Sequence, residues 1–407
     1  MKNHMAGESI LDKIINQKQA ETIGRLHVGD IITTLLERLG EREQDILKRR
    51  FGLSKAAKAT LEEIGKSHNL TRERVRQIET GSIAKLKKLD DLVAIVADLK
   101  MLVTRLLEDH GGLMDKEYLF DILSALAIDH GKAKDEDPKV YRNHFNFILS
   151  KIIDSEIEPV ESSEHFNTSF KMRYQELDHL EELAKELLNK VKSVKRLFIT
   201  EELLDLVRET DSYKKYEEKF KTKEGLDLAD ALRGIVPDNE LDLANEHKSL
   251  FSILKAIAQI EQNKFGYWGH GESREINPKT INDKIYLVLK NHGKPLHYEE
   301  ISKKINETGF DGKKVNTATV HNELILDGKY VLVGRGLYAL KEWGYSKGTV
   351  ADVIADVLTK AQKPLTKKEI TEEVMKQRMV KKTTIDLALM NKKRFERMTG
   401  NKYALVK

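Results

Sequence analysis

The stretch that decides the fold is residues 60–89, which read TLEEIGKSHNLTRERVRQIETGSIAKLKKL. Thr60 and Thr71 are each placed to cap a helix, because a threonine hydroxyl accepts a hydrogen bond from an otherwise unpaired N–H of the first turn. The segment SHNL at 67–70 lies between the two expected helices and predicts a turn. Two capped helices joined by a short turn have the layout of a helix-turn-helix.

The second of these helices, expected over residues 72–89, has two different faces. A buried stripe is predicted at helical spacing by Val75, Ile78, Ile83 and Leu86. The other side carries, within the first two turns, Arg72, Glu73, Arg76 and Gln77. Arginine donates twice to guanine, glutamine pairs with adenine and glutamate accepts from cytosine, so these residue types can read base edges. Taken alone, such a face is more typical of a solvated charged helix.

Lysines follow on the same helix and are expected to contact DNA phosphates. They are Lys85, Lys87 and Lys88.

Four short sequence motifs, which occur in this order, favour base reading over a merely solvated face. They are LGERE at 39–43, RFGL at 50–53, TLEEIG at 60–65 and TRERVRQIE at 71–79. Together they resemble region 4 of housekeeping-type sigma-70 factors, the −35-recognition domain, over about fifty residues. The resemblance implies that Arg72, Glu73, Arg76 and Gln77 read bases, and that Arg42, Arg50 and Leu61 contact the DNA backbone. It places Arg74 beside them, toward phosphate or a partner protein, and it implies docking on the flap of the RNA polymerase β subunit.

The chain departs from this family in two respects. Gly81 stands where the family has a basic residue, and no aromatic-rich, promoter-melting region 2 or region 3 is found. About thirty residues precede the resemblance, too few for those regions. We therefore expect a protein that locates promoter DNA and does not open it by itself.

A repeated unit occupies the rest of the chain. Residues 290–301 (KNHGKPLHYEEI) parallel 360–370 (KAQKPLTKKEI), and weaker echoes begin at His110 and Val194. An amphipathic helix precedes each copy, a short helix follows it, and a third helix leads toward a hairpin, which is the plan of a winged helix. The last two copies have hairpins expected at 330–340 and 397–406.

The sequence therefore predicts a mainly α, multi-domain fold, in which a sigma-region-4 helix-turn-helix precedes tandem winged-helix domains with short β-hairpin wings. The expected domains are an N-terminal helix at 1–30, the helix-turn-helix at 31–90, an acidic helical domain at 92–173, a helical domain at 176–268, and winged helices at 279–345 and 349–407. The two middle domains are expected to be winged helices on the weaker echoes alone.

The unit at 281–345 also resembles a known family. Its segments GKPLH at 293–297 and VGRGLYALKEW at 333–343 are similar to the HARE-type winged helix, a family that includes the N-terminal domain of the RNA polymerase delta subunit. Such domains bind nucleic acid or protein, and the sequence leaves both open. The expected contact residues are Lys314, Asn316, Thr317, Thr319 and Asn322 on the exposed side of the third helix, Arg335 at the wing tip, and Lys381 and Lys382 in the last unit.

Charge is distributed unevenly along the chain. Residues 279–407 carry 26 Lys and Arg against 15 Asp and Glu, residues 31–90 carry 14 against 9, and residues 91–278 have a net charge of −12. Two basic ends indicate contact with a polyanion. The chain has no cysteine, no apolar run of about 20 residues and no signal-peptide pattern. We expect a soluble, cytoplasmic, nucleoid-associated bacterial protein.

No catalytic or metal-binding motif is found. Gly65-Lys66-Ser67 lacks the first glycine of a P-loop, and the thirteen histidines do not pair with carboxylates at metal-ligand spacing. We expect no enzyme, cofactor, metal or small-molecule substrate. The favoured interpretation is a sequence-specific transcription factor whose partners are double-stranded DNA and core RNA polymerase. The alternatives are a polymerase-associated accessory protein whose modules bind subunits, and a DNA-specificity component of a defence system.

Overall fold

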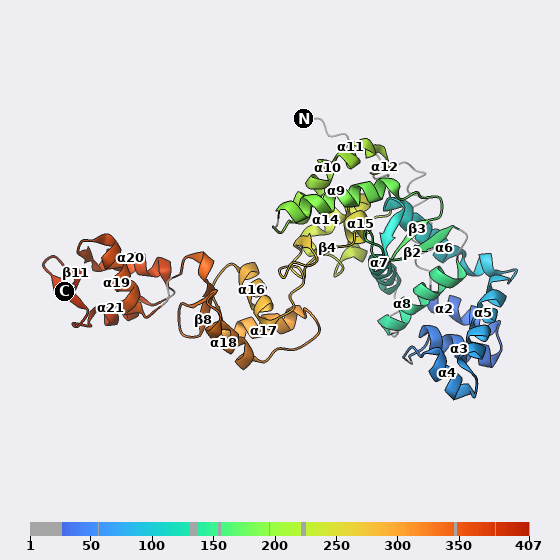
Figure 1. Cartoon of the computed structure of the whole chain (residues 1–407), viewed down its shortest axis with the longest axis horizontal. Coiled ribbons are helices and arrows are strands. Elements are labelled where there is room, and N and C mark those ends of the chain that lie inside the picture. The colour runs from blue at the N-terminus through green and yellow to red at the C-terminus, as the bar shows by residue number, and fades with distance from the viewer. Residues whose placement is uncertain are drawn as a thin grey trace. The chain divides into compact units, whose positions relative to one another are not determined.

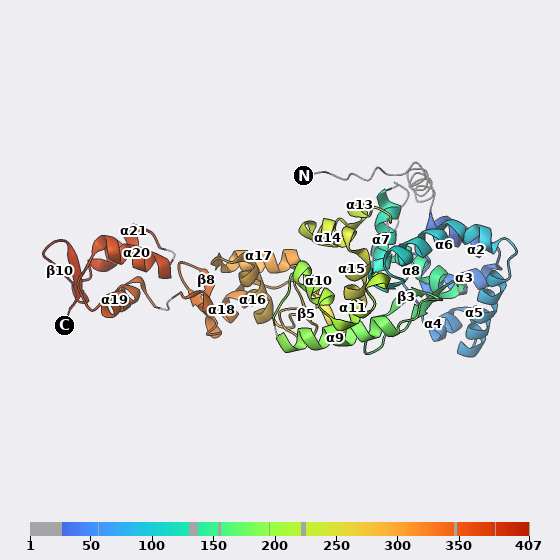
Figure 2. The ribbon, with the colours of Figure 1, turned by 90° about the horizontal axis from the view of Figure 1, so that it is seen from above.

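The computed structural model describes residues 27–55, 57–129, 137–153, 156–194, 196–220, 225–345, 348–378 and 380–406. The chain divides into two compact units, one made of residues 1–262 with 266–270 and the other of residues 263–265 with 271–407. Both are mainly helical with small antiparallel sheets, as the sequence predicts (Figures 1 and 2). The helix expected at 1–30 lies outside the described residues, except for its last positions. No helix in the described ranges is long and apolar enough to cross a membrane.

Four helices form what we call the head, residues 28–88. They are α2 (Val28–Glu37), α3 (Glu41–Phe51), α4 (Leu61–His68) and α5 (Arg72–Lys87). The apolar residues of α2 fall at spacings of three and four, and Ile32, Leu35 and Leu36 are buried. Helix α3 is capped at its C-terminal end by Gly52, whose φ of 65° lies in the left-handed region that favours glycine.

The first repeat follows the head directly. In chain order it contains α6 (Leu92–Asp109), β1 (Leu113–Asp115), α7 (Lys116–Asp129), α8 (Pro138–Phe147), the π-helical turn η1 (Ile148–Ile152), β2 (Ile157–Val160) and β3 (Ser169–Met172). The strand order is β1-β3-β2, so the first strand pairs with the last. Leu113 lies opposite Lys171, and Ile157 lies opposite Met172.

The second repeat completes the first unit. It contains α9 (Asp178–Val194), α10 (Thr200–Arg208), the short helices α11 (Asp211–Lys215), α12 (Glu217–Phe220), α13 (Ala229–Leu232), η2 (Asp238–Glu240) and α14 (Leu241–Glu246), then α15 (Lys248–Ala256), β4 (Ile260–Gln262) and β5 (Trp268–His270). A bridge between Phe198 and Trp268 stands where the other repeats have their first strand.

The third repeat belongs to the second unit. It contains α16 (Ile281–His292), β6 (Leu296–His297), α17 (Tyr298–Thr308), α18 (Thr317–Leu326), β7 (Tyr330–Leu332), β8 (Leu337–Leu340) and η3 (Lys341–Trp343). Its strand order is β6-β8-β7, and Tyr330 pairs with Leu340. The predicted hairpin at 330–340 is confirmed.

The fourth repeat ends the chain and has its own core. It contains α19 (Val350–Ala361), β9 (Leu365–Thr366), α20 (Lys367–Gln377), α21 (Lys382–Leu389), β10 (Phe395–Met398) and β11 (Lys402–Leu405). The last strand again pairs with both others, in the order β10-β11-β9. In the described residues, therefore, the first, third and fourth repeats share one order of elements: a helix, a first strand, further helices and a hairpin whose second strand lies in the middle of the sheet. The second repeat departs from it, because it has a single bridge at Phe198 in place of the first strand and more helices before its hairpin.

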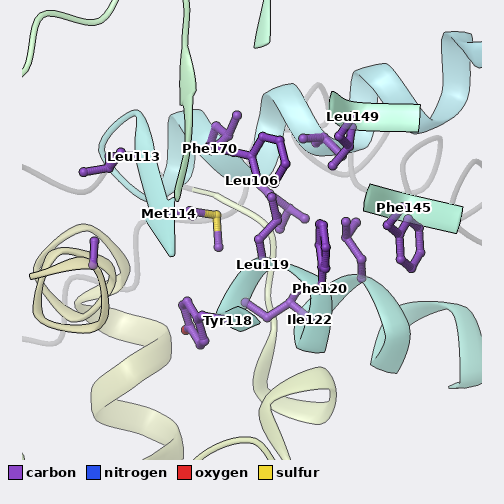
Figure 3. Close-up of a cluster of buried hydrophobic side chains, with 14 of the residues drawn as sticks. Leu106, Leu113, Met114, Tyr118, Leu119, Phe120, Ile122, Phe145, Leu149 and Phe170 are labelled. Carbon is purple, nitrogen blue, oxygen red and sulfur yellow. The ribbon is translucent and has the colours of Figure 1, made fainter. Parts of the chain in front are cut away.

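A continuous hydrophobic core joins the head to the first and second repeats. Figure 3 shows its centre, where Leu106 of α6, Met114 of β1, Phe120 of α7 and Phe170 of β3 lie close together. Phe120 and Phe170 have ring centroids 5.8 Å apart. Leu35 and Leu86 of the head belong to the same core, so the head is packed onto the repeat that follows it.

The head is held mainly by the third helix of the first repeat. The side-chain amide of Asn143 donates to the carbonyl of Gly52 at 3.0 Å, and Nε2 of His144 lies 3.2 Å from the carbonyl of Leu53. The rings of Phe51 and Phe147 are 4.9 Å apart. Because α8 and η1 contact the head in this way, we call residues 138–152 the mount.

Candidate nucleic-acid interface

The helix-turn-helix is built from two capped helices and a left-handed turn residue. The backbone N–H of Thr60 donates to Glu63 at 2.7 Å and that of Glu63 donates to the Thr60 hydroxyl at 3.2 Å, a reciprocal capping box at the start of α4. Asn69 ends α4 with a φ of 53°, and the Thr71 hydroxyl accepts from the Arg74 N–H at 3.2 Å to start α5. The two predicted threonine caps are confirmed.

A small separate core fixes the angle between these helices. Ile46 of α3, Ile64 of α4 and Val75 of α5 are buried against one another, with Leu70 and Ile78 at the edge. Gly65 allows the close approach, because a Cβ there would lie 2.7 Å from the carbonyl oxygen of Leu70. The N–H of Leu70 donates to the Gly65 carbonyl at 2.8 Å, so backbone and packing both hold the turn.

Of the buried stripe predicted on α5, Val75 and Leu86 are buried and Ile78 and Ile83 are half-buried, and the stripe is divided between two cores. Val75 and Ile78 pack in the small core of the helix-turn-helix, whereas Ile83 and Leu86 pack in the large core with the first repeat. Ser82, which the prediction omitted, is also buried and donates to the carbonyl of Ile78 at 2.7 Å. α5 is therefore held at both ends, and its orientation depends on the first repeat as well as on α4.

The four predicted base-reading residues lie together on the exposed side of α5. Arg72, Glu73, Arg76 and Gln77 are all exposed, as is Arg74. Arg76 donates to both oxygens of Glu73, from Nε at 2.9 Å and from Nη2 at 2.7 Å. Gln77 donates to Glu73 at 3.4 Å and accepts from Arg74 at 3.2 Å.

This network sets both charge and geometry. The hydrogen bond from Arg76 holds the pKa of Glu73 below its usual value, and Glu73 raises the pKa of Arg76. Arg76 uses two of its five N–H donors on Glu73, which leaves three that can meet base edges. Hydrogen bonds thus link four of these side chains, Glu73, Arg74, Arg76 and Gln77, in the absence of a ligand.

The predicted backbone contacts lie around this face, and several already have partners within the head. Arg50 pairs with Glu79 at 3.3 Å, Arg42 donates to the carbonyl of His68 at 3.3 Å, and Lys85 pairs with Glu43. Leu61 is half-buried against the small core. Lys87 and Lys88 are exposed at the end of α5.

A link that the sequence did not reveal ties α3 to the end of α4. Nε2 of His68 lies 2.7 Å from Asp45, and Nε of Arg49 donates to the same oxygen at 2.8 Å. Partial burial pushes the pKa of Asp45 upward, but the hydrogen bonds from Arg49 and His68 outweigh it and lower the pKa. The i, i+4 spacing of Asp45 and Arg49 was visible in the sequence, whereas the contact with His68 needs the tertiary fold.

The predicted contacts of the third and fourth repeats lie on or just before α18 and α21, except Arg335, which lies between β7 and β8, and they differ in exposure. Lys314, Asn322, Arg335, Lys381 and Lys382 are exposed.

Three other positions on or beside α18 are shaped by local bonding. Asn316 accepts from the N–H of Ala318 at 2.9 Å and caps α18. Thr317 and Thr319 are half-buried, which corrects the expectation of an exposed row, and Thr317 donates to Ser302 of α17 at 3.2 Å. Capping and packing account for these three side chains without any ligand.

Comparison with known proteins places one part of the chain. Residues 35–88 match the family described as Sigma-70, region 4. The RNA polymerase principal sigma factor HrdD of Streptomyces viridifaciens is 36% identical over 88 residues, which are 21% of this chain and 26% of that protein. The sigma factor RpoD of Helicobacter pylori (strain 26695) is 53% identical over 57 residues, 14% of this chain and 8% of that protein.

A third relative, sigma factor SigA of Lactococcus lactis subsp. cremoris, is 36% identical over 81 residues, which are 20% of this chain and 22% of that protein. The chain thus spans about a quarter or less of the length of these relatives. No solved structure matches it. Residues 35–88 are therefore a sigma-70 region 4 domain, and its helix-turn-helix consists of α4 and α5.

Proposed function

We propose that this chain is a bacterial transcription factor that recognises −35-like promoter DNA through its region 4 domain and acts with RNA polymerase at initiation. The observation that carries the proposal is the exposed row Arg72, Glu73, Arg76 and Gln77 on α5. These side chains point away from both cores that hold α5, and their types match the major-groove pattern of bases. The named relatives are RNA polymerase sigma factors, which supports the same role for this domain.

The contacts between the mount and the head support a role for the first repeat in positioning α5. Since Asn143, His144 and Phe147 of α8 contact the end of α3, part of the third helix of the first repeat is already covered by the head. We propose that the acidic first repeat orients the region 4 domain and that its own third helix, α8, does not meet DNA. Its net negative charge would repel phosphate, so DNA is directed to the head.

The recurring order of elements supports a tandem winged-helix organisation. In each repeat the first strand pairs with the last strand of the hairpin, or makes a single bridge to it. We propose that the third repeat is a HARE-type winged helix and that the two basic repeats at the C-terminus contribute contacts to DNA or to polymerase. We also propose that the region 4 domain docks on the flap of the polymerase β subunit. The protein would act in the cytoplasm, on the nucleoid, as a binding protein and not an enzyme. Several linked weak contacts raise the total affinity through effective concentration.

Equilibrium binding of the full-length protein to short duplexes tests the proposal. The expected result is preference for a −35-like duplex over a scrambled one at moderate salt. Exchanging Gln77 or Arg76 for alanine should reduce discrimination at one base pair by about 1–3 kcal/mol, whereas Lys87→Ala should weaken all sequences alike. Lys66→Ala, on the outer side of α4, is the matched control. Equal affinity of the wild-type protein for both duplexes would refute the proposal.

A further inference from the structure

The third helices of the third and fourth repeats, α18 and α21, each bury two residues in the core of their repeat at the same spacing. Val320 and Leu324 of α18 are buried four residues apart, as are Ile385 and Leu389 of α21. Each pair packs in the core of its own repeat. The two helices can therefore be compared position by position, and the residue after the last buried leucine is Ile325 in one and Met390 in the other.

The side chains at both of these equivalent positions are large, apolar and exposed. Ile325 is 62% exposed and Met390 is 71% exposed. On α21 a second apolar side chain, Leu387, is 68% exposed. Thr383, Leu387 and Met390 are spaced i, i+4, i+7, so they form one row on the side opposite Ile385 and Leu389.

The outer row of α21 is poorly suited to reading bases. A helix that reads DNA presents hydrogen-bond donors and acceptors in the major groove, as α5 does with Arg72, Glu73, Arg76 and Gln77. Leu387 and Met390 offer none, and their exposure to water is unfavourable until a partner covers them. The outer face of α21 therefore fits a protein surface better than it fits base edges.

The charged residues that flank this row in the sequence indicate the partner's charge. Lys381 and Lys382 precede it, Lys392 and Lys393 follow it, and all four are exposed. Residues 349–407 as a whole carry 14 Lys and Arg against 7 Asp and Glu. Two copies of such a surface would repel each other, whereas an acidic surface would be attracted. Arg394 is not counted, because it is paired with Asp352 at 2.6 Å.

We propose that Leu387 and Met390, with the four exposed lysines that flank them in the sequence, form a docking surface for an acidic protein segment that carries apolar side chains. Taking that segment to belong to RNA polymerase rests on the proposed function. The surface assigns different tasks to the two ends of the chain: α5 reads DNA and α21 binds protein.

The test measures binding of the full-length chain to purified bacterial core RNA polymerase. The variant Leu387→Ser/Met390→Ser removes the apolar row, and Val93→Ser/Met101→Ser is the matched control, since these α6 side chains are 73% and 55% exposed. The first variant should weaken binding at least about tenfold, ~1.4 kcal/mol, while the control stays within about twofold. Lys392→Glu/Lys393→Glu should also weaken binding and reduce its dependence on salt.

Binding to the −35-like duplex, measured with the same proteins, separates the possible outcomes. Unchanged DNA affinity together with weakened polymerase binding supports the docking surface. The inference is overturned if the serine variant binds polymerase as the wild type does, if the wild type does not bind polymerase, or if DNA affinity falls by the same factor. It is also overturned if the serine variant converts a dimer into a monomer in sedimentation. Failure of the wild type to prefer the −35-like duplex would count against the proposed function alone.

Discussion

Gly65 provides a quantitative test of how the helix-turn-helix is held. In Gly65→Ala the new Cβ would lie 2.7 Å from the carbonyl oxygen of Leu70, a backbone atom in the turn. Separations below 3.0 Å are essentially never seen for real Cβ atoms, so either α4 or the turn must move by several tenths of an ångström. The N–H of Leu70 donates a hydrogen bond to the carbonyl of Gly65 at 2.8 Å, and Leu70 borders the core formed by Ile46, Ile64 and Val75.

The magnitude follows from two opposing contributions. Overpacking at a tight site costs about 1–3 kcal/mol, and the better helix propensity of alanine returns up to about 1 kcal/mol. We expect Gly65→Ala to destabilise the head by about 1–2 kcal/mol. Gly81→Ala is the matched control on α5, because a Cβ there meets nothing within 4 Å. It should stabilise α5 by about 0.5–1 kcal/mol.

Native-state hydrogen exchange is the suitable assay, because a chain with several repeats need not unfold in one step. The amides of α4 and α5 should lose protection in Gly65→Ala and gain it in Gly81→Ala, and affinity for the −35-like duplex should fall in the first variant only. If both substitutions change protection in the same direction, the close approach of Gly65 to the turn does not hold the two helices.

Three further predictions concern the cap of α5, the mount and a buried histidine. Thr71→Ala removes the hydroxyl that accepts from the Arg74 N–H and should lower the stability of α5, measured by hydrogen exchange of its amides, by about 1 kcal/mol. Thr71→Ser keeps a hydroxyl and should retain most of that stability. Phe147→Ala removes the ring that packs against Phe51 and should lower the free energy of unfolding of the first unit by about 3–5 kcal/mol in chemical denaturation. The same variant should make the head more sensitive to limited proteolysis. An unchanged digestion pattern would contradict the claim that the mount holds the head. Burial lowers the pKa of His110 from 6.5 to about 4, so the unfolded state takes up the proton first as the pH falls. Stability of the first unit should be full above pH 6.5 and decrease by about 3 kcal/mol toward pH 4, and a His110→Gln variant with the same pH slope would rule this out.

The helix-turn-helix could be predicted because its determinants are local. Thr60, Glu63, Thr71 and the spacing of Val75 and Ile78 lie within twenty residues, and capping and periodicity act over that range. The hairpin at 330–340 was visible for the same reason, since glycines and alternating apolar residues mark a turn between two strands.

The mount could not be predicted, because it joins residues far apart in the chain. Asn143 and His144 bond to carbonyls 91 positions earlier, and no periodicity encodes which surfaces will meet. The division of the α5 stripe between two cores is also a matter of tertiary contacts, since Ile83 and Leu86 pack in the large core with the first repeat. The amphipathic pattern identified the inward-facing apolar positions of α5, but it missed Ser82 and did not show that two different cores cover them.

Guanine methylation protection tests the central claim most directly, because N7 of guanine lies in the major groove where α5 is proposed to bind. Full-length protein on promoter DNA should protect guanines within the −35 element from dimethyl sulfate, and Arg76→Ala should lose protection at one of them while keeping the rest. Protection that is absent, or that is equal on scrambled DNA, would contradict the assignment of Arg72, Glu73, Arg76 and Gln77 as the residues that read the promoter.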